Sequence, residues 1–222
     1  MIIDELSTMN DSPDSIPNKI NESMQKPEIN SNLDERTRAI ISELVNILEK
    51  SSKDMRPVVV DGGLGIELFV ADRDKQNGLF RNHGDLDIRP MEDDIGYWKE
   101  TLREMGFIID DNIPNVDSSK AFTATMPDTG KGNEFRIDVW GLKIEDDKRV
   151  SSSETGTKVY YDQNWEDLVN KVEWKGMQTF VIKPEIILAN KLEYSQKKKM
   201  PLRKGDLIDY AQAGISVPKI EN

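Results

Sequence analysis

The sequence contains no cysteine, only one histidine, and few aromatic residues, which make up 7% of its 222 positions. The absence of cysteine excludes disulfides, thiolate metal sites and cysteine nucleophiles together, and it fits a reducing compartment. No apolar run approaches the ~20 residues that a membrane-spanning helix needs, and the N-terminus lacks the basic-then-apolar order of a secretion signal. We therefore expect a cytoplasmic protein.

The chain also lacks a net positive charge, because 41 acidic side chains outnumber 30 basic ones and the formal net charge is −11. A surface that binds nucleic acid through its phosphates is normally basic, so this charge argues against a general nucleic-acid binder. Residues 1–35 hold eight acidic and two basic side chains and supply −6, so the rest of the chain carries only −5. One local basic run stands out, made of Lys197, Lys198, Lys199, Arg203 and Lys204.

Composition divides the chain into three parts. Residues 1–32 are rich in Ser, Asn, Asp and Pro with isolated hydrophobic residues, so they cannot bury enough apolar surface to offset their ordering entropy. We predict a disordered or loosely docked acidic arm over 1–32, a core over 33–183, and a C-terminal helical segment over 184–222.

Hydrophobic periodicity predicts an α+β fold for the core. Helical spacing is found over about 32–52, 64–70, 98–105, 164–169, 184 onward and 202–213. Apolar or alternating runs predict strands over about 57–60, 84–89, 107–109, 121–126 and 134–141, and a strand or hairpin over 172–182. These elements predict a mixed or largely antiparallel sheet flanked by helices.

The first chemical signal is the triplet Asp85-Leu86-Asp87 on the expected strand 84–89. Residues two apart on a strand point to the same face about 7 Å apart, so both carboxylates can converge on hard cations. Magnesium prefers oxygen ligands, and two-metal phosphoryl chemistry uses carboxylates that bridge a pair of ions. Alternating acids also occur on any solvated strand face, so the triplet alone does not decide between a site and a surface.

The second signal is the double glycine Gly62-Gly63, between an apolar strand and a helix. A lone glycine pair is often a plain tight turn. Glycine also lets backbone amides approach phosphate oxygens, and a helix start adds donors and a favourable dipole. A strand, this turn, a helix and then a strand with two acids place each part where a triphosphate with its metals requires it.

Asp138 is the candidate third carboxylate, on a later strand with alternating apolar residues. By itself it is as readily an exposed acid on an amphipathic strand. Beside Asp85 and Asp87 it gains a role, because nucleotidyl transfer needs the attacking hydroxyl polarised or deprotonated, and a carboxylate can do this while helping to hold a catalytic ion.

These segments together carry a resemblance to a known family. The runs VVVDGGLGIELFV, RNHGDLDI and FRIDVWG resemble the antibiotic nucleotidyltransferases of the DNA polymerase beta superfamily, particularly the lincosamide and aminoglycoside 2″ enzymes. The runs WKGMQTFVIKPEIILANKLEY and RKGDLIDY are also similar to abortive-infection toxin nucleotidyltransferases. The resemblance covers about residues 55–213. It implies a polymerase beta-like mixed sheet, a small C-terminal helical part, an NTP donor and Mg²⁺, with two ions expected.

The resemblance also implies roles for single residues. Asp85, Asp87 and Asp138 are the catalytic and metal-binding positions. Gly62, Gly63, Arg81 and Lys191 are the nucleotide-binding candidates, although Arg81 could instead pair with the acidic cluster and Lys191 could be a solvated charge. For His83, the only histidine, a structural role before the metal strand is favoured over a role as general base.

Three functions remain open for the chain. A small hydroxylated acceptor, such as an aminoglycoside or a lincosamide-like compound, is favoured over RNA by the acidic body and the motif match. A tRNA or protein acceptor is supported by the basic run and the toxin-like C-terminal segments. A non-catalytic nucleotide-binding module is least favoured, because all three acids are present.

Overall fold

The computed structural model describes residues 33–75, 79–114, 116–128, 133–145, 148–152, 158–161 and 165–217. The predicted arm over 1–32 lies outside the described residues, so its conformation stays a prediction. Among the described residues, no helix combines the length and the apolar character needed to cross a membrane.

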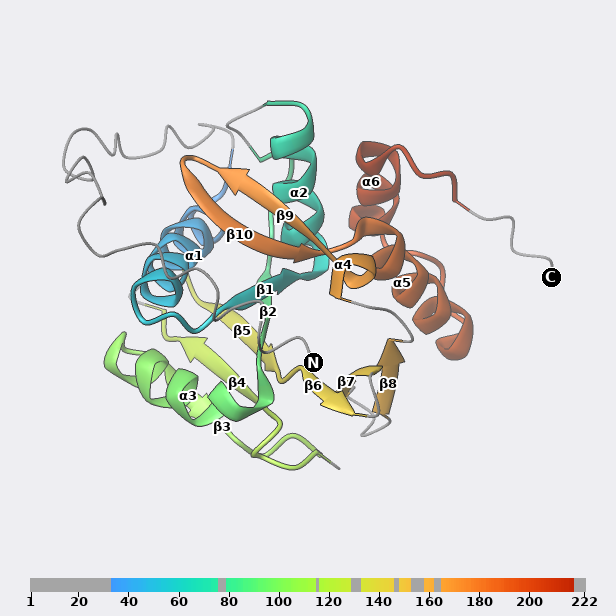
Figure 1. The fold of residues 1–222 in the computed structure, drawn as a ribbon. Coiled ribbons are helices and arrows are strands. Elements are labelled where there is room, and N and C mark those ends of the chain that lie inside the picture. The colour runs from blue at the N-terminus through green and yellow to red at the C-terminus, as the bar shows by residue number, and fades with distance from the viewer. Residues whose placement is uncertain are drawn as a thin grey trace, which may run out of the picture.

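A seven-stranded mixed sheet forms the centre of the fold (Figure 1). Its strands are β1 (Val58–Asp61), β2 (Asp85–Pro90), β3 (Ile108–Asp110), β4 (Ala121–Met126), β5 (Phe135–Trp140), β9 (Val169–Trp174) and β10 (Met177–Ile182). Their spatial order is β3-β4-β5-β2-β1-β10-β9. The pairs β2–β5 and β1–β10 are parallel and the other neighbours are antiparallel. The mixed α+β architecture expected from the sequence is confirmed.

Helices cover the sheet on both faces. They are α1 (Glu35–Lys53), α2 (Gly62–Arg73), α3 (Ile95–Glu104), α4 (Trp165–Leu168), α5 (Pro184–Lys198) and α6 (Lys204–Ala213), with a 3₁₀ turn η1 at Glu92–Asp94. Helix α1 begins after Asp34, whose side chain accepts a hydrogen bond of 2.7 Å from the backbone N–H of Thr37. Helix α6 ends at Gly214, which adopts a φ of 75°, as expected for a helix stop.

Two hydrophobic cores lie on opposite faces of the sheet. Alternate strand residues such as Leu86 and Ile137 pack with the apolar stripes of α1 and α3. On the other face, Val59 packs with residues of α5 and α6. Helix α2 contributes to both cores, which explains why its polar residues are so few. Because Leu86 faces α1 and α3, its neighbours Asp85 and Asp87 face the side of α5 and α6.

A second, three-stranded antiparallel sheet was not expected from the sequence. Its strands are β6 (Lys143–Glu145), β7 (Lys148–Ser152) and β8 (Lys158–Tyr161), in the order β6-β7-β8. These short segments are rich in Lys, Arg and Ser, so they lack the apolar alternation from which strands are predicted. In Figure 1 this sheet lies beyond the end of the main sheet, beside α5.

Candidate functional site

A row of carboxylates crosses the three central strands of the main sheet. Asp87 on β2 is paired in register with Asp61 at the end of β1 and with Asp138 on β5. Directly paired residues on adjacent strands point to the same face, so these three side chains lie side by side. We call Asp61, Asp87 and Asp138 the acid row. Asp85 lies two residues before Asp87 on the same face and is exposed.

The acid row concentrates negative charge at one place. The pKa of Asp87 is raised from 3.8 to about 8, first by burial and then by the carboxylates of Asp61, Asp85 and Asp138. The guanidinium of Arg89 opposes this rise but does not cancel it. A cation bound here therefore relieves the repulsion that the protein alone leaves uncompensated.

Arginines hold the two outer members of the row. Arg89 Nε donates a hydrogen bond to Asp61 Oδ2, and Arg136 Nη2 donates one of 2.8 Å to Asp138 Oδ2. Within the part of the chain that the structure describes, no three acidic or histidine side chains are already arranged as a metal site. The oxygen-only donor set and the excess negative charge fit Mg²⁺. A carboxylate has two oxygens and can accept several bonds, so the contact with Arg136 does not by itself prevent Asp138 from binding a metal ion.

The double glycine turn lies directly against the acid row. Gly62 has a φ of 65°, a left-handed conformation that favours glycine, and its N–H donates a bond of 2.7 Å to Asp61 Oδ1. A Cβ on Gly62 would lie 2.1 Å from Asp87 Oδ2, and a Cβ on Gly63 would lie 1.8 Å from Arg81 Nη2. Both glycines are therefore required so that Asp87 and Arg81 can approach the start of α2. The role of their amides as a phosphate cradle stays a prediction.

Arg81 and Lys191, which are 110 positions apart in the sequence, meet at one buried carboxylate. Arg81 donates Nε and Nη2 to the two oxygens of Asp209, at 2.8 and 3.0 Å. Lys191 Nζ lies 2.7 Å from Asp209 Oδ2 and 3.0 Å from Asp206 Oδ1. Asp209 is fully buried and Asp206 nearly so. We call Arg81, Lys191, Asp206 and Asp209 the cation clamp, because the two acids fix two cations beside Gly63.

His83 is placed by hydrogen bonds within the protein. Its Nε2 is 2.8 Å from Oε1 of Glu67, a fully buried residue of α2. Its backbone N–H donates a bond of 2.8 Å to the hydroxyl of Thr37 on α1. The other Glu67 oxygen accepts the N–H of Phe80 at 3.1 Å. These contacts join α1, α2 and the segment before β2, which supports the structural role expected for His83 over that of a general base.

Sequence reasoning did not select Asp61, Glu67 or Asp209 as site residues. Asp61 directly precedes the double glycine, so its position at the end of an apolar strand was the available signal. Glu67 is an acid in a nearly apolar helix, a pattern that marks a buried and paired carboxylate. Asp209 gave no local signal beyond its motif, since its partners come from remote parts of the chain.

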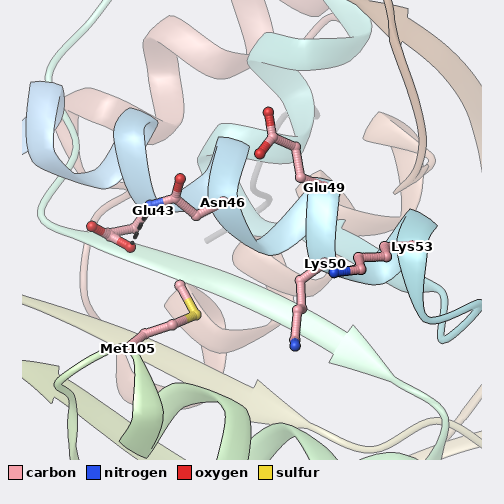
Figure 2. Close-up of a pocket in the computed structure, with 6 residues that line it drawn as sticks. All are labelled: Glu43, Asn46, Glu49, Lys50, Lys53 and Met105. Carbon is pink, nitrogen blue, oxygen red and sulfur yellow. Dashed lines mark hydrogen bonds between the residues drawn. The ribbon is translucent and has the colours of Figure 1, made fainter. Parts of the chain in front are cut away.

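The described surface has hollows, and two of them are informative. One of about 370 Å³ lies at the start of β2 and β5 and is lined by Arg36, Gly84, Asp85, Thr125, Glu134, Phe135 and Arg136. The other, of about 400 Å³, lies between α1 and the end of α3 (Figure 2). Its lining consists of Glu43, Asn46, Glu49, Lys50 and Lys53 of α1 with Met105. The hollow on α1 contains none of the candidate catalytic residues, whereas the other hollow includes Asp85.

Solved structures with this fold support the family resemblance. No protein-family model and no curated protein sequence matches the chain. The fold is similar to lincosamide antibiotic adenylyltransferase LnuA in its lincomycin-bound form, with a TM-score of 0.56 and 17% identity over 78% of this chain and 95% of that chain. It is also similar to the antibiotic-resistance factor ANT(2″)-Ia, with a TM-score of 0.55 and 14% identity over 80% of this chain and 83% of that chain. The expected resemblance to antibiotic nucleotidyltransferases is thus confirmed at the level of the fold.

A structure of ANT(2″)-Ia in complex with adenylyl-2″-tobramycin shows the same likeness. Its TM-score is 0.53, with 13% identity over 80% of this chain and 87% of that chain. The similarity therefore spans most of both proteins. At such low identities it establishes the shared fold, and the chemistry must be argued from the site itself.

Proposed function

We propose that this protein is a magnesium-dependent nucleotidyltransferase that transfers a nucleoside monophosphate from an NTP to a hydroxyl group of a small molecule, such as an aminoglycoside or a lincosamide-like compound. The observation that carries the proposal is the acid row lying against the double glycine turn, with the cation clamp beside it. Carboxylates for metal ions and cations for phosphates are the two requirements of nucleotidyl transfer.

Each group of residues has a place in the reaction. The acceptor oxygen forms a bond to the α-phosphorus, the bond from that phosphorus to the bridging oxygen breaks, and pyrophosphate leaves. Arg81 and Lys191 bind the phosphates that leave and stabilise their growing negative charge. Asp138 accepts the proton of the attacking hydroxyl. Magnesium, held by Asp85, Asp87 and Asp138 as two ions, would neutralise charge on the phosphates and orient them.

Two features of the structure supply preorganisation. Asp209 holds both cations of the clamp with hydrogen bonds of 2.7 to 3.0 Å, so they need not be ordered when the NTP binds. His83 and Glu67 fix the segment between Arg81 and β2 against α2. Arg81 and Asp85 therefore belong to one segment whose position is fixed, so both can act on the same NTP.

A labelling experiment tests the proposal. The protein is incubated with Mg²⁺ and each NTP labelled at the α-phosphate, together with pooled hydroxylated small molecules, tRNA and protein, and the three fractions are separated. We expect label in the small-molecule fraction, a loss of at least about a hundredfold in Asp85→Asn, and full activity in Asp93→Asn. Asp93 is an exposed acid outside the acid row and supplies the same change of charge. Full activity in Asp85→Asn, or no label in any fraction, would refute the proposal.

The same experiment distinguishes the proposed function from the two other functions. For RNA, the available basic run is partly compensated, since Lys197 pairs with Glu193 and Arg203 pairs with Asp206. Label confined to tRNA and lost on reversing the charges of Lys198 and Lys199 would favour an RNA acceptor. Tight NTP binding without release of pyrophosphate in any mixture would favour the non-catalytic module.

A further inference from the structure

The first turn of helix α6 lies against Arg81 of the cation clamp. A Cβ on Gly205 would lie 3.7 Å from Cζ and Nη1 of Arg81, so the backbone of this turn is close to the guanidinium. Leu202 packs against the core on this face of the sheet, and the N–H of Leu207 donates a bond of 3.1 Å to the carbonyl of Arg203. The backbone of Arg203, which directly precedes α6, is therefore fixed at the edge of the clamp.

The side chain of Arg203 is far more accessible than the cations of the clamp. It is 76% exposed, whereas Lys191 and Arg81 are 14% and 18% exposed. The two clamp cations are therefore held below the surface, and the Arg203 guanidinium reaches into solvent beside them. A ligand that enters from solvent can contact Arg203 without displacing the protein around it.

The carboxylate of Asp206 does not depend on the side chain of Arg203. Arg203 Nε and Nη2 each donate a bond of 3.1 Å to it. Asp206 Oδ1 also lies 3.0 Å from Lys191 Nζ, and Oδ2 accepts the backbone N–H of Arg203 at 3.0 Å. Each oxygen keeps a partner if the guanidinium turns away, so the change leaves no buried carboxylate oxygen unsatisfied. Arg81 lacks this freedom, because its Nε is bound to the fully buried Asp209.

The charges of the region call for a further cation. The clamp holds two cations and two carboxylates, so their formal charges cancel. Arg203 adds a positive charge that the clamp alone does not have. Its pKa is raised first by the hydrogen bonds to Asp206 and further by the negative charges of Asp206, Asp85 and Asp87, while burial opposes the rise. The guanidinium therefore lies between the clamp and the candidate metal ligands, where the phosphates of an NTP would be bound.

We propose that Arg203 is a third phosphate-binding cation of the NTP site, which turns from Asp206 to the triphosphate and selects a triphosphate over a monophosphate. A planar guanidinium can donate two parallel charge-assisted bonds to phosphate oxygens. Arg81 and Lys191 hold the deep side of the triphosphate, and Arg203 holds its solvent-exposed side. A monophosphate lacks the phosphates that reach these cations. The inference rests on the proposed function.

Binding measurements on matched variants test the inference. The probes are each NTP, the corresponding NMP and inorganic pyrophosphate, all with Mg²⁺. Arg203→Met should weaken binding of the NTP and of pyrophosphate at least about tenfold, as expected for a lost charge-assisted hydrogen bond, and leave NMP binding unchanged. Arg203→Lys keeps the charge without the planar fork and should recover part of this affinity. Lys198→Met removes a charge from the same basic run at an exposed position of α5, and should bind every probe like the wild type.

The outcomes separate the inference from the function on which it rests. Melting temperatures establish that each variant is folded. If Arg203 only stabilises the start of α6, Arg203→Met should melt at a lower temperature and bind the NTP and the NMP with equal changes in affinity. That result, or NTP binding as tight as in Lys198→Met, overturns the inference, while transfer of label by the wild type still supports the proposed function. Absence of NTP binding in the wild type overturns both.

Discussion

Asp87 is the residue whose environment is most unusual in this site. It lies between Asp61 and Asp138 and near Asp85, and burial removes water that would otherwise screen these like charges. Ionisation of a carboxylate in such a position is costly in the metal-free protein. It becomes favourable when a cation binds. The same repulsion thus lowers stability and increases the affinity for a cation.

Asp87→Asn should abolish transfer while raising the stability of the metal-free protein by at least about 1 kcal/mol at alkaline pH. Because the folded-state pKa of Asp87 is raised from 3.8 to about 8, the folded protein retains a proton that the unfolded chain releases between these values. The cost of ionising Asp87 is absent at pH values below the lower figure, grows as pH rises, and is complete above the higher one. Thermal unfolding in EDTA at a series of pH values measures this.

The gain in stability should therefore be larger at pH 9 than at pH 4, and magnesium should reduce it by stabilising the wild type alone, as expected for a ligand that binds the folded state. Asp93→Asn is the control for a general loss of negative charge. A gain that is equal at both pH values, or equal in the two variants, would contradict the assignment of Asp87 to a repulsive cluster.

The guanidinium of Arg81 can lie against the start of α2 because the second residue of the helix, Gly63, has no side chain. Gly63→Ala places a Cβ where Arg81 Nη2 now lies, at 1.8 Å, so the guanidinium must move away from the start of the helix. We expect NTP binding to weaken at least tenfold if Arg81 contacts the phosphates, which corresponds to about 1.4 kcal/mol. Equilibrium titration with each NTP and Mg²⁺ is the measurement.

The control for this substitution is Gly96→Ala on α3. Apart from its chain neighbours and the backbone of its own helix, no atom lies within 4 Å of a Cβ at Gly96, and alanine in a helix is about 0.5–1 kcal/mol more favourable than glycine. Gly96→Ala should therefore leave NTP binding unchanged and raise the melting temperature slightly. Unchanged NTP binding in Gly63→Ala would show that Arg81 has no part in phosphate recognition.

Helix α6 is connected to the site through Asp209. Asp209→Asn removes the charge that holds Arg81 and Lys191, and breaking a buried ion pair in this way typically costs about 3–5 kcal/mol. We expect reduced stability together with weaker NTP binding, measured by denaturant unfolding and by titration. In a double-mutant cycle with Arg81→Met, the two substitutions should be strongly non-additive. Additive effects would show that Asp209 does not hold Arg81 in place.

At the scale of the whole molecule, charge is distributed unevenly. The arm over residues 1–32 holds six acidic and two basic side chains and so supplies −4 of the net charge of −11, and the sequence-based prediction is that it is disordered or loosely docked. Deletion of residues 1–32 should change the melting temperature by less than about 2 °C and leave transfer to a small acceptor intact, because a 1 kcal/mol loss shifts the midpoint of a domain of this size by ~2–4 °C. A large fall in stability would place the arm within the folded unit.

The larger architecture was partly predictable from local patterns. The strands around Asp87 and Asp138 follow from alternating apolar residues, and α1 follows from a helical stripe that includes Ile40 and Leu44. The strands β6 to β8 did not follow, because their sequences lack the regular apolar alternation from which strands are predicted. The division between the core and the C-terminal segment stays a prediction. The helices of that segment, α5 and α6, pack closely on α2 of the core.

The sequence by itself determined the chemistry that this chain can offer. The double glycine after an apolar strand, and two acids spaced by one residue on another, are local features whose meaning depends only on backbone geometry and side-chain type. Tertiary structure decided which groups meet. The register of three strands aligns Asp61 with Asp87 and Asp138, and a slip of one residue would turn a carboxylate to the opposite face. Arg81 reaches Asp209 across 128 positions of sequence, because helix packing joins segments whose contacts no local pattern encodes.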